Sequence, residues 1–152
     1  MQEPDVTPSP GEPSTGRPPV IFQASVLPIR RNEEGDAVCL VTSLKKKRWI
    51  FPKGIIAPGE SPESSALKEA FEEAGLLGRI VGAPLGSYSE EKWGTAIEVT
   101  VYLMEVDRQE HHWAESHRRK RLFAPLSVAE GLIKKPILKE MVQRAVQRME
   151  AE

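Results

Sequence analysis

A helix with well-marked ends, residues 61–75, constrains the fold of this chain most strongly. Ser61 is a favoured N-cap residue, Pro62 suits the first helical position, and Gly75 is typical of a helix end. The apolar residues between them recur at one-turn spacing and form a single stripe, made of Leu67, Ala70, Phe71 and Ala74. The pattern predicts a helix that packs this stripe against the core of a larger domain.

The segments on either side of this helix alternate between strand-like and helix-like patterns. Residues 20–29 are rich in apolar and β-branched side chains and predict a strand, in which Pro28 indicates a sheet edge or a strand end. Further strands are predicted at residues 38–44, 85–88, 97–106 and 121–123, and further helices at 127–134, with Ser127 as N-cap, and from Pro136 onward. The fold class that follows is α/β, a mixed sheet with helices on its faces.

The length and composition are those of one ordinary globular domain. A chain of 152 residues can bury a substantial core without disulfides or a structural metal. Residues 1–18 are dominated by proline, serine and glycine and are predicted to be a disordered tail, so that residues 19–152 form the domain. The formal net charge of −1 provides no general case for binding nucleic acid or a membrane.

The lone cysteine, Cys39, lies in an apolar run and is predicted to be a buried strand thiol. No apolar stretch approaches the roughly 20 residues of a membrane span, and the N-terminus lacks the apolar core of a signal peptide. We therefore expect a protein of the reducing cytoplasm. Monomer and homodimer both remain open.

Three acidic residues share one face of the predicted helix, because Glu69, Glu72 and Glu73 stand at i, i+3 and i+4. Repulsion at this spacing costs only a few tenths of a kcal/mol per pair, so a solvated surface face remains one interpretation. A site for Mg²⁺ is the other, because this ion prefers carboxylate and carbonyl oxygens. The preceding Pro52-Lys53-Gly54 adds a backbone carbonyl for a metal and an ammonium group for a phosphate.

The spacing becomes more specific when the preceding loop is included. Gly54 is followed after five residues by Glu60, and after seven more by the run Lys68-Glu69-Ala70-Phe71-Glu72-Glu73-Ala74-Gly75-Leu76. This pattern resembles the Nudix box, in which a glycine and a glutamate precede Arg-Glu, an apolar residue, any residue, Glu-Glu, any residue, glycine and an apolar residue. Every fixed position matches except Lys68, where the family has arginine. The resemblance implies the Nudix fold, an α/β/α sandwich with a mixed sheet, and a hydrolase of phosphoanhydrides.

The resemblance also implies a metal site. Glu69 and Glu73 correspond to ligands of Mg²⁺, for which Mn²⁺ is an alternative, and the main-chain carbonyl of Lys53 completes the site. Glu72 corresponds to a further ligand or to the base that activates water, and we expect it to be the catalytic residue. In this mechanism the metal neutralises phosphate oxygens and lowers the pKa of a water, whose proton Glu72 takes.

Glu60 matches the family position that pairs with the basic residue of the box and orients the helix. Lysine is a point charge and cannot make the planar two-pronged contact of arginine. We therefore expect the pair of Glu60 and Lys68 to be less rigid than the family's, with activity retained.

Beyond the box, the chain resembles the diphosphoinositol polyphosphate and diadenosine polyphosphate phosphohydrolase branch of the family. The resembling segments are Val41-Thr42-Ser43, Arg48-Trp49-Ile50, Arg118-Arg119-Lys120-Arg121 with Phe123, and Lys135-Pro136. Positions that contact substrate in that branch match Thr42, Ser43, Lys92, Arg118 and Lys135. The expected partner is thus a small polyphosphate.

Several alternatives remain at this point. The cationic run 118–121 suits phosphate binding but is also typical of a solvated loop. Tyr88, Trp93 and Trp113 are candidates to stack on a nucleotide base, although packing is the slightly better explanation for each of them. The runner-up functions are a hydrolase of damaged nucleoside triphosphates and a phosphate-binding domain without catalysis. Loss of box acids would favour the latter, and this chain retains them.

Overall fold

Two long strands, β1 (Val20–Arg30) and β7 (Thr95–Gln109), form the centre of a mixed sheet. They run parallel, in register from Val20 opposite Ala96 to Ile29 opposite Glu105. The structure is a computed structural model that describes residues 19–151. The predicted tail, residues 1–18, lies outside the described residues.

The other strands pair antiparallel with these two or with each other. The sheet has eight strands, with β3-β2-β1-β7-β5 as its main path, while β4 pairs with β1, β6 with β7 and β8 with β2. The bounds are β2 (Ala37–Thr42), β3 (Trp49–Ile50), β4 (Lys53–Ile55), β5 (Leu76–Ile80), β6 (Gly86–Lys92) and β8 (Arg121–Pro125).

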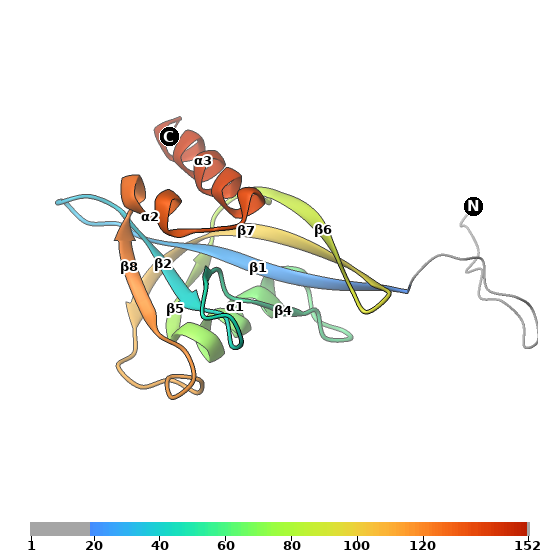
Figure 1. Ribbon diagram of the computed structural model, residues 1–152. Coiled ribbons are helices and arrows are strands. Elements are labelled where there is room, and N and C mark those ends of the chain that lie inside the picture. The colour runs from blue at the N-terminus through green and yellow to red at the C-terminus, as the bar shows by residue number, and fades with distance from the viewer. Residues whose placement is uncertain (1–18, 152) are drawn as a thin grey trace, which may run out of the picture.

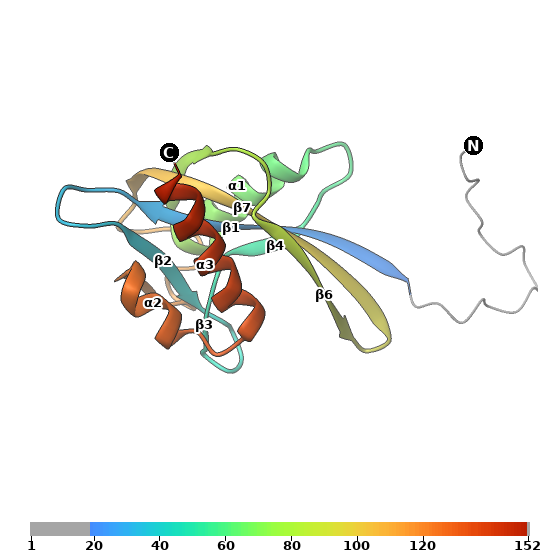
Figure 2. The same ribbon diagram turned by 90° about the horizontal axis from the view of Figure 1, so that it is seen from above.

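Helices cover the two faces of the sheet (Figure 1). On one face lies α1 (Pro62–Ala74), and on the other lie α2 (Leu126–Leu132) and α3 (Pro136–Glu150), as Figure 2 also shows from above. Each face has its own core: α1 packs in a cluster with Val26 and Val41, whereas α2 and α3 pack in a cluster with Leu40 and Val99. The predicted α/β/α sandwich is confirmed. None of the helices within residues 19–151 has the length and apolar content that a membrane crossing requires.

The predicted apolar stripe of α1 was partly wrong. Its ends are confirmed, but the most buried positions are the alanines 66, 70 and 74, while Phe71 is 43% exposed. Small side chains allow a helix to approach a sheet closely, which larger ones at the same positions would prevent. The helix is therefore turned so that Glu73, only 6% exposed, lies at the packed side.

Pro28 was predicted to mark an edge or a strand end, yet it is buried in the central strand β1. The N–H of Val26 points to the β4 side, where it donates to the Pro52 carbonyl. Residue 28 faces the same side because strand residues alternate. Pairing with β4 ends at Ser25 and pairing with β2 begins at Ile29, so proline occupies a gap where no donor is needed.

Other predictions also differ from the structure. The short strands β3, β4 and β5 were not predicted, and in β5, directly after α1, Gly78 and Arg79 interrupt the apolar pattern. The predicted cap at Ser127 was also wrong. The helix α2 begins at Leu126 after Pro125, and no side chain caps it.

Candidate active site

The helix α1 is fixed at both ends by the residues that the sequence indicates. The Ser61 hydroxyl accepts a hydrogen bond from the Ser64 N–H at 3.0 Å, and Gly75 ends the helix in the left-handed conformation with φ of 68°. The Trp113 indole packs against Gly75 and donates to the carbonyl of Glu73 at 2.8 Å. Trp113 therefore closes the end of α1, which favours its packing interpretation.

Two box glutamates meet the β4 backbone. The Glu73 carboxylate accepts a hydrogen bond from the Lys53 N–H at 3.3 Å. Next to it, the Glu69 carboxylate lies so close to Gly54 that a Cβ there would be 2.2 Å from Glu69 Cδ. Since real carbon contacts are never so short, only glycine leaves room for this carboxylate at the strand.

Burial raises the pKa of Glu73, and the neighbouring Glu69 adds to the effect while Arg119 opposes it. Burial also raises the pKa of Glu69, with the charge of Glu72 as the next cause. Burial thus outweighs the opposing charges, Arg119 at Glu73 and Lys68 at Glu69, and the pKa of each carboxylate stays raised.

Arg119 is a candidate site residue that the sequence analysis did not single out. Its side chain is 8% exposed, and its three nitrogens each have a partner: Glu115 at 2.6 Å, the Thr42 carbonyl at 2.9 Å and Glu73 at 3.6 Å. The sequence signal was the cationic run at 118–121, which does not reveal which member points inward. The predicted Arg118 instead pairs with Glu115 at 3.3 Å and has a half-exposed side chain.

The residues present fit a hard divalent cation. Charge interactions link four acids, Glu69, Glu72, Glu73 and Glu115. Because Gly54 has no Cβ, the Glu69 carboxylate fits against the strand beside it. Across residues 19–151, no three His, Cys, Asp or Glu side chains already converge as a ready-made ligand set. Glu72 is half-buried, with no side-chain hydrogen bond or ion pair to another described residue. An added cation would thus gather acids that now repel each other.

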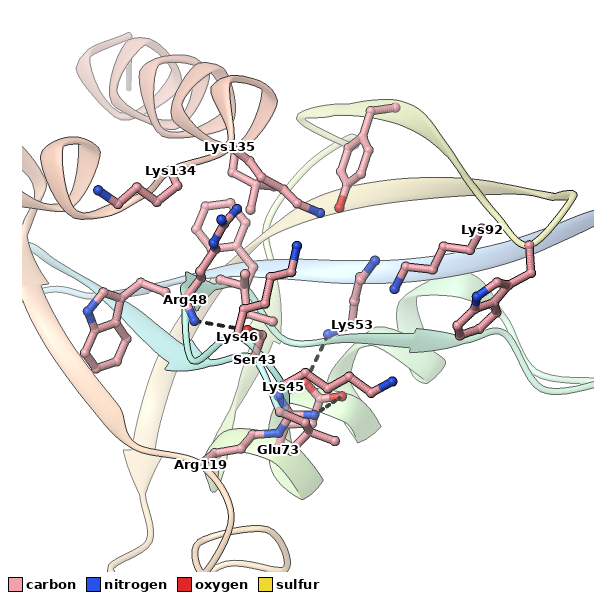
Figure 3. Close-up of a pocket in the computed structure, with 17 residues that line it drawn as sticks. Ser43, Lys45, Lys46, Arg48, Lys53, Glu73, Lys92, Arg119, Lys134 and Lys135 are labelled. Atoms are coloured by element: carbon pink, nitrogen blue, oxygen red, sulfur yellow. Dashed lines mark hydrogen bonds and ion pairs between the residues drawn. The ribbon is translucent and has the colours of Figure 1, made fainter.

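A cavity of about 520 Å³ opens at one of these acids, Glu73 (Figure 3). Among the described residues Glu73 is its one acidic lining residue, and Arg119 lies beside it. Eight basic residues line it: Lys45, Lys46, Arg48, Lys53, Lys92, Arg119, Lys134 and Lys135. Such a lining attracts an anion with several charges.

Three of the five predicted substrate contacts line this cavity, namely Ser43, Lys92 and Lys135. Thr42 does not, because its side chain is buried and its hydroxyl accepts from the Lys120 N–H at 2.9 Å. Arg118 also lies outside the lining, and Arg119 is the arginine of the run that contributes to it.

The predicted helix-orienting pair is not formed within the described part of the chain. Glu60 instead accepts a hydrogen bond from the Ser65 hydroxyl at 3.0 Å, and this hydroxyl also accepts from the Ala57 N–H at 3.3 Å. Lys68 is exposed, and its charge acts on Glu69. Glu60 therefore ties the loop before α1 to the helix without the basic residue.

Glu90 is a second residue that the sequence analysis missed. It lies on β6, and its carboxylate pairs with Lys53 at 3.2 Å and with Lys135 at 3.5 Å. Glu90 is two residues after Tyr88 in this strand and so shares its half-buried face.

Aromatic side chains complete the cavity. Trp49 and Tyr88 are half-buried in its wall, whereas Trp93 is 91% exposed in the turn between β6 and β7. Packing therefore does not explain Trp93. The backbone φ of Trp93 is 51°, which is unfavourable for a large side chain, and yet a tryptophan stands at this position in the cavity lining.

Known proteins share this sequence pattern. Residues 21–143 match the NUDIX domain. The chain is 34% identical over 119 residues to diphosphoinositol polyphosphate phosphohydrolase 3-beta of Bos taurus, which covers 75% of this chain and 71% of that protein. It is 32% identical over 114 residues to the mitochondrial Nudix hydrolase 18 of Arabidopsis thaliana, covering 74% and 64%. For the human diphosphoinositol polyphosphate phosphohydrolase 3-alpha, only 52% of that protein is covered.

Solved structures share the fold. The crystal structure of the C. elegans Ap4A hydrolase matches with a TM-score of 0.69 at 19% identity, over 86% of this chain and 98% of that chain. The MutT protein from Methanosarcina mazei Go1 matches with a TM-score of 0.62 at 18% identity, over 86% and 96%. Because the NUDIX domain matches residues 21–143 and the bovine relative is 34% identical, the chain belongs to the NUDIX family of hydrolases.

Proposed function

We propose that this protein is a Mg²⁺-dependent hydrolase of phosphoanhydride bonds in dinucleoside polyphosphates or diphosphoinositol polyphosphates. The supporting observation is that the cavity with eight basic lining residues reaches Glu73, next to Glu69. The basic lining residues would hold a substrate with several phosphates, and the glutamates would hold a divalent cation, as phosphoryl transfer requires.

The metal part of the proposal assigns Glu69, Glu73 and the Lys53 carbonyl as ligands, with Mn²⁺ as an alternative ion. A divalent cation there would supply neutralisation of phosphate oxygens and acidification of a water. Glu72 would accept the proton of the attacking water, and its lack of a competing side-chain partner among the described residues supports this role. The buried guanidinium of Arg119 would hold Glu73 in place.

The basic lining residues would bind and orient the phosphates. Ser43, Lys92 and Lys135 keep their proposed roles, and Arg119 is a better candidate than Arg118 because it lines the cavity. Thr42 would act indirectly, since its carbonyl holds Arg119 at 2.9 Å.

The aromatic residues favour a nucleotide as the first substrate to test. Trp49, Tyr88 and Trp93 line the same cavity, and flat aromatic faces stack on bases. The many lysines that line the cavity favour a diphosphoinositol polyphosphate as the second substrate to test. Nucleoside triphosphates remain the alternative enzyme substrates, and retention of all three box acids opposes a non-catalytic binding domain.

The test is product analysis with Mg²⁺ on diadenosine tetraphosphate, a diphosphoinositol phosphate and nucleoside triphosphates. Glu72→Gln should reduce turnover at least roughly a hundredfold, as loss of a general base does. The matched control is Glu63→Gln, an exposed acid in the first turn of the same helix. Near-equal turnover of both variants would remove Glu72 from the base role. Release of a mononucleotide and pyrophosphate from triphosphates alone would favour the alternative substrate class.

The compartment that we propose is the cytoplasm, supported by the free, buried thiol of Cys39. Cell fractionation tests this, and recovery in mitochondria, as the name of the Arabidopsis relative states for that protein, would contradict it.

A further inference from the structure

Glu90 places one carboxylate between two lysines of the cationic cavity. The same oxygen, Oε2, lies 3.2 Å from Lys53 Nζ and 3.5 Å from Lys135 Nζ. Its side chain is 16% exposed, and that of Lys53 is 23% exposed. Water therefore screens the pair with Lys53 less than an ordinary surface pair.

The three residues come from different elements. Glu90 lies on β6, Lys53 begins β4, and Lys135 is the residue before α3. Figure 3 shows the ammonium groups of both lysines directed into the cavity. The carboxylate thus pairs with two ammonium groups that an anionic ligand would need to bind.

The geometry agrees with an ionised carboxylate. Two ammonium groups within 3.5 Å of one oxygen stabilise the negative charge of Glu90, and an ordinary carboxyl group is already ionised at neutral pH.

We propose that Glu90 is an intramolecular competitor for the phosphate-binding lysines, so that only ligands dense in phosphate bind the cavity at low concentration. A ligand must break both ion pairs to reach Lys53 and Lys135, and this cost is the same for every ligand. A single phosphate regains little beyond it, whereas a diphosphate brings more charge and more acceptor oxygens. Glu90 therefore sets the affinity that a ligand must exceed, and this role rests on the proposed use of the cavity for phosphates.

The test compares orthophosphate and pyrophosphate binding by titration calorimetry, with EDTA present so that no turnover occurs. Glu90→Gln keeps the size of the side chain and removes its charge. Glu91→Gln is the matched control, because Glu91 is the next residue on β6 and is exposed. We expect Glu90→Gln to tighten orthophosphate binding roughly five- to tenfold, as loss of two partly screened competing ion pairs implies. Pyrophosphate binding should tighten by a similar factor, because it displaces the same carboxylate, and Glu91→Gln should change either constant less than twofold.

Equal tightening by the two variants would overturn the proposal in favour of a general charge effect. Weaker phosphate binding by Glu90→Gln would also overturn it, since Glu90 would then be positioning the lysines. A second variant, Lys135→Gln, removes one ion pair, and in that background Glu90→Gln should have a smaller effect.

Turnover measured in parallel separates this inference from the proposed function. An active wild-type enzyme whose Glu90→Gln variant gains no phosphate affinity overturns the inference alone. A wild-type protein that binds neither phosphate compound and cleaves no substrate overturns both.

Discussion

Replacing Gly54 by alanine tests whether the Glu69 carboxylate must lie against β4. An alanine Cβ would be 2.2 Å from Glu69 Cδ, and ordinary contact begins at 3.4 Å, so the carboxylate must move by at least about 1.2 Å. The atoms that clash belong to the end of a flexible side chain, which can swing away. We therefore expect a loss of no more than about 1 kcal/mol in unfolding free energy, at the lower end of overpacking costs.

The expected effect on activity is much larger. A displacement of about 1 Å at a group that organises the reaction costs roughly a hundredfold in rate. Initial rates on diadenosine tetraphosphate across a Mg²⁺ titration, together with urea unfolding, measure both quantities. Gly131→Ala is the control, because a Cβ there meets nothing within 4 Å, and α2 should gain about 0.5–1 kcal/mol. Turnover of Gly54→Ala within threefold of wild type at all Mg²⁺ concentrations would refute the reasoning. A loss of more than about 3 kcal/mol in unfolding free energy would also refute it, because the Glu69 side chain would then not be free to move.

Three other substitutions test separate parts of the structure. Arg119→Gln removes the buried partner of Glu73 and should cost roughly 3 kcal/mol without metal, as measured by urea unfolding, and Mg²⁺ should restore more stability in the variant than in wild type. Trp93→Asn places a residue that tolerates positive φ in the turn, so the melting temperature should not fall, while the KM for diadenosine tetraphosphate should rise roughly tenfold and that for a diphosphoinositol phosphate should stay within twofold. Burial raises the pKa of Cys39 to about 12, so the folded state holds its proton more tightly than the unfolded state. The stability from this proton is complete below pH of about 8.5 and is lost as pH rises toward 12, by about 2 kcal/mol at pH 10, and Cys39→Ala should lack that part of the pH dependence in urea unfolding.

The parts of the fold that local chemistry determines could be predicted from the sequence. The ends of α1 follow from Ser61, Pro62 and Gly75, each of which acts on the backbone within one turn. The long strand β7 follows from its alternating apolar residues Ile97, Val99, Val101 and Leu103. By contrast, the place of Pro28 depends on where two other strands stop pairing, which no local pattern contains.

The charged groups of the cavity depend on contacts between distant parts of the chain. Glu90 is 37 positions from Lys53 and 45 from Lys135, and each of the three looks like an ordinary surface residue in sequence. In the same way, Arg119 and Arg118 are adjacent and chemically identical. Only the loop between β7 and β8 decides that Arg119 turns inward, to the Thr42 carbonyl and Glu73.

The rotation of α1 connects the packing of the fold to its chemistry. The apolar spacing predicted a stripe of Leu67, Ala70, Phe71 and Ala74 against the core, and of these only Phe71 is exposed. The buried alanines 66, 70 and 74 let the helix approach the sheet, and this approach brings the Glu73 carboxylate to the Lys53 N–H at 3.3 Å. Burying a carboxylate is unfavourable unless it has partners, and the partners here are one N–H and one guanidinium at 3.6 Å. A helix with larger residues at the alanine positions would sit farther from β4 and could not hold its acids there, so the small residues of α1 are as necessary to the site as the glutamates.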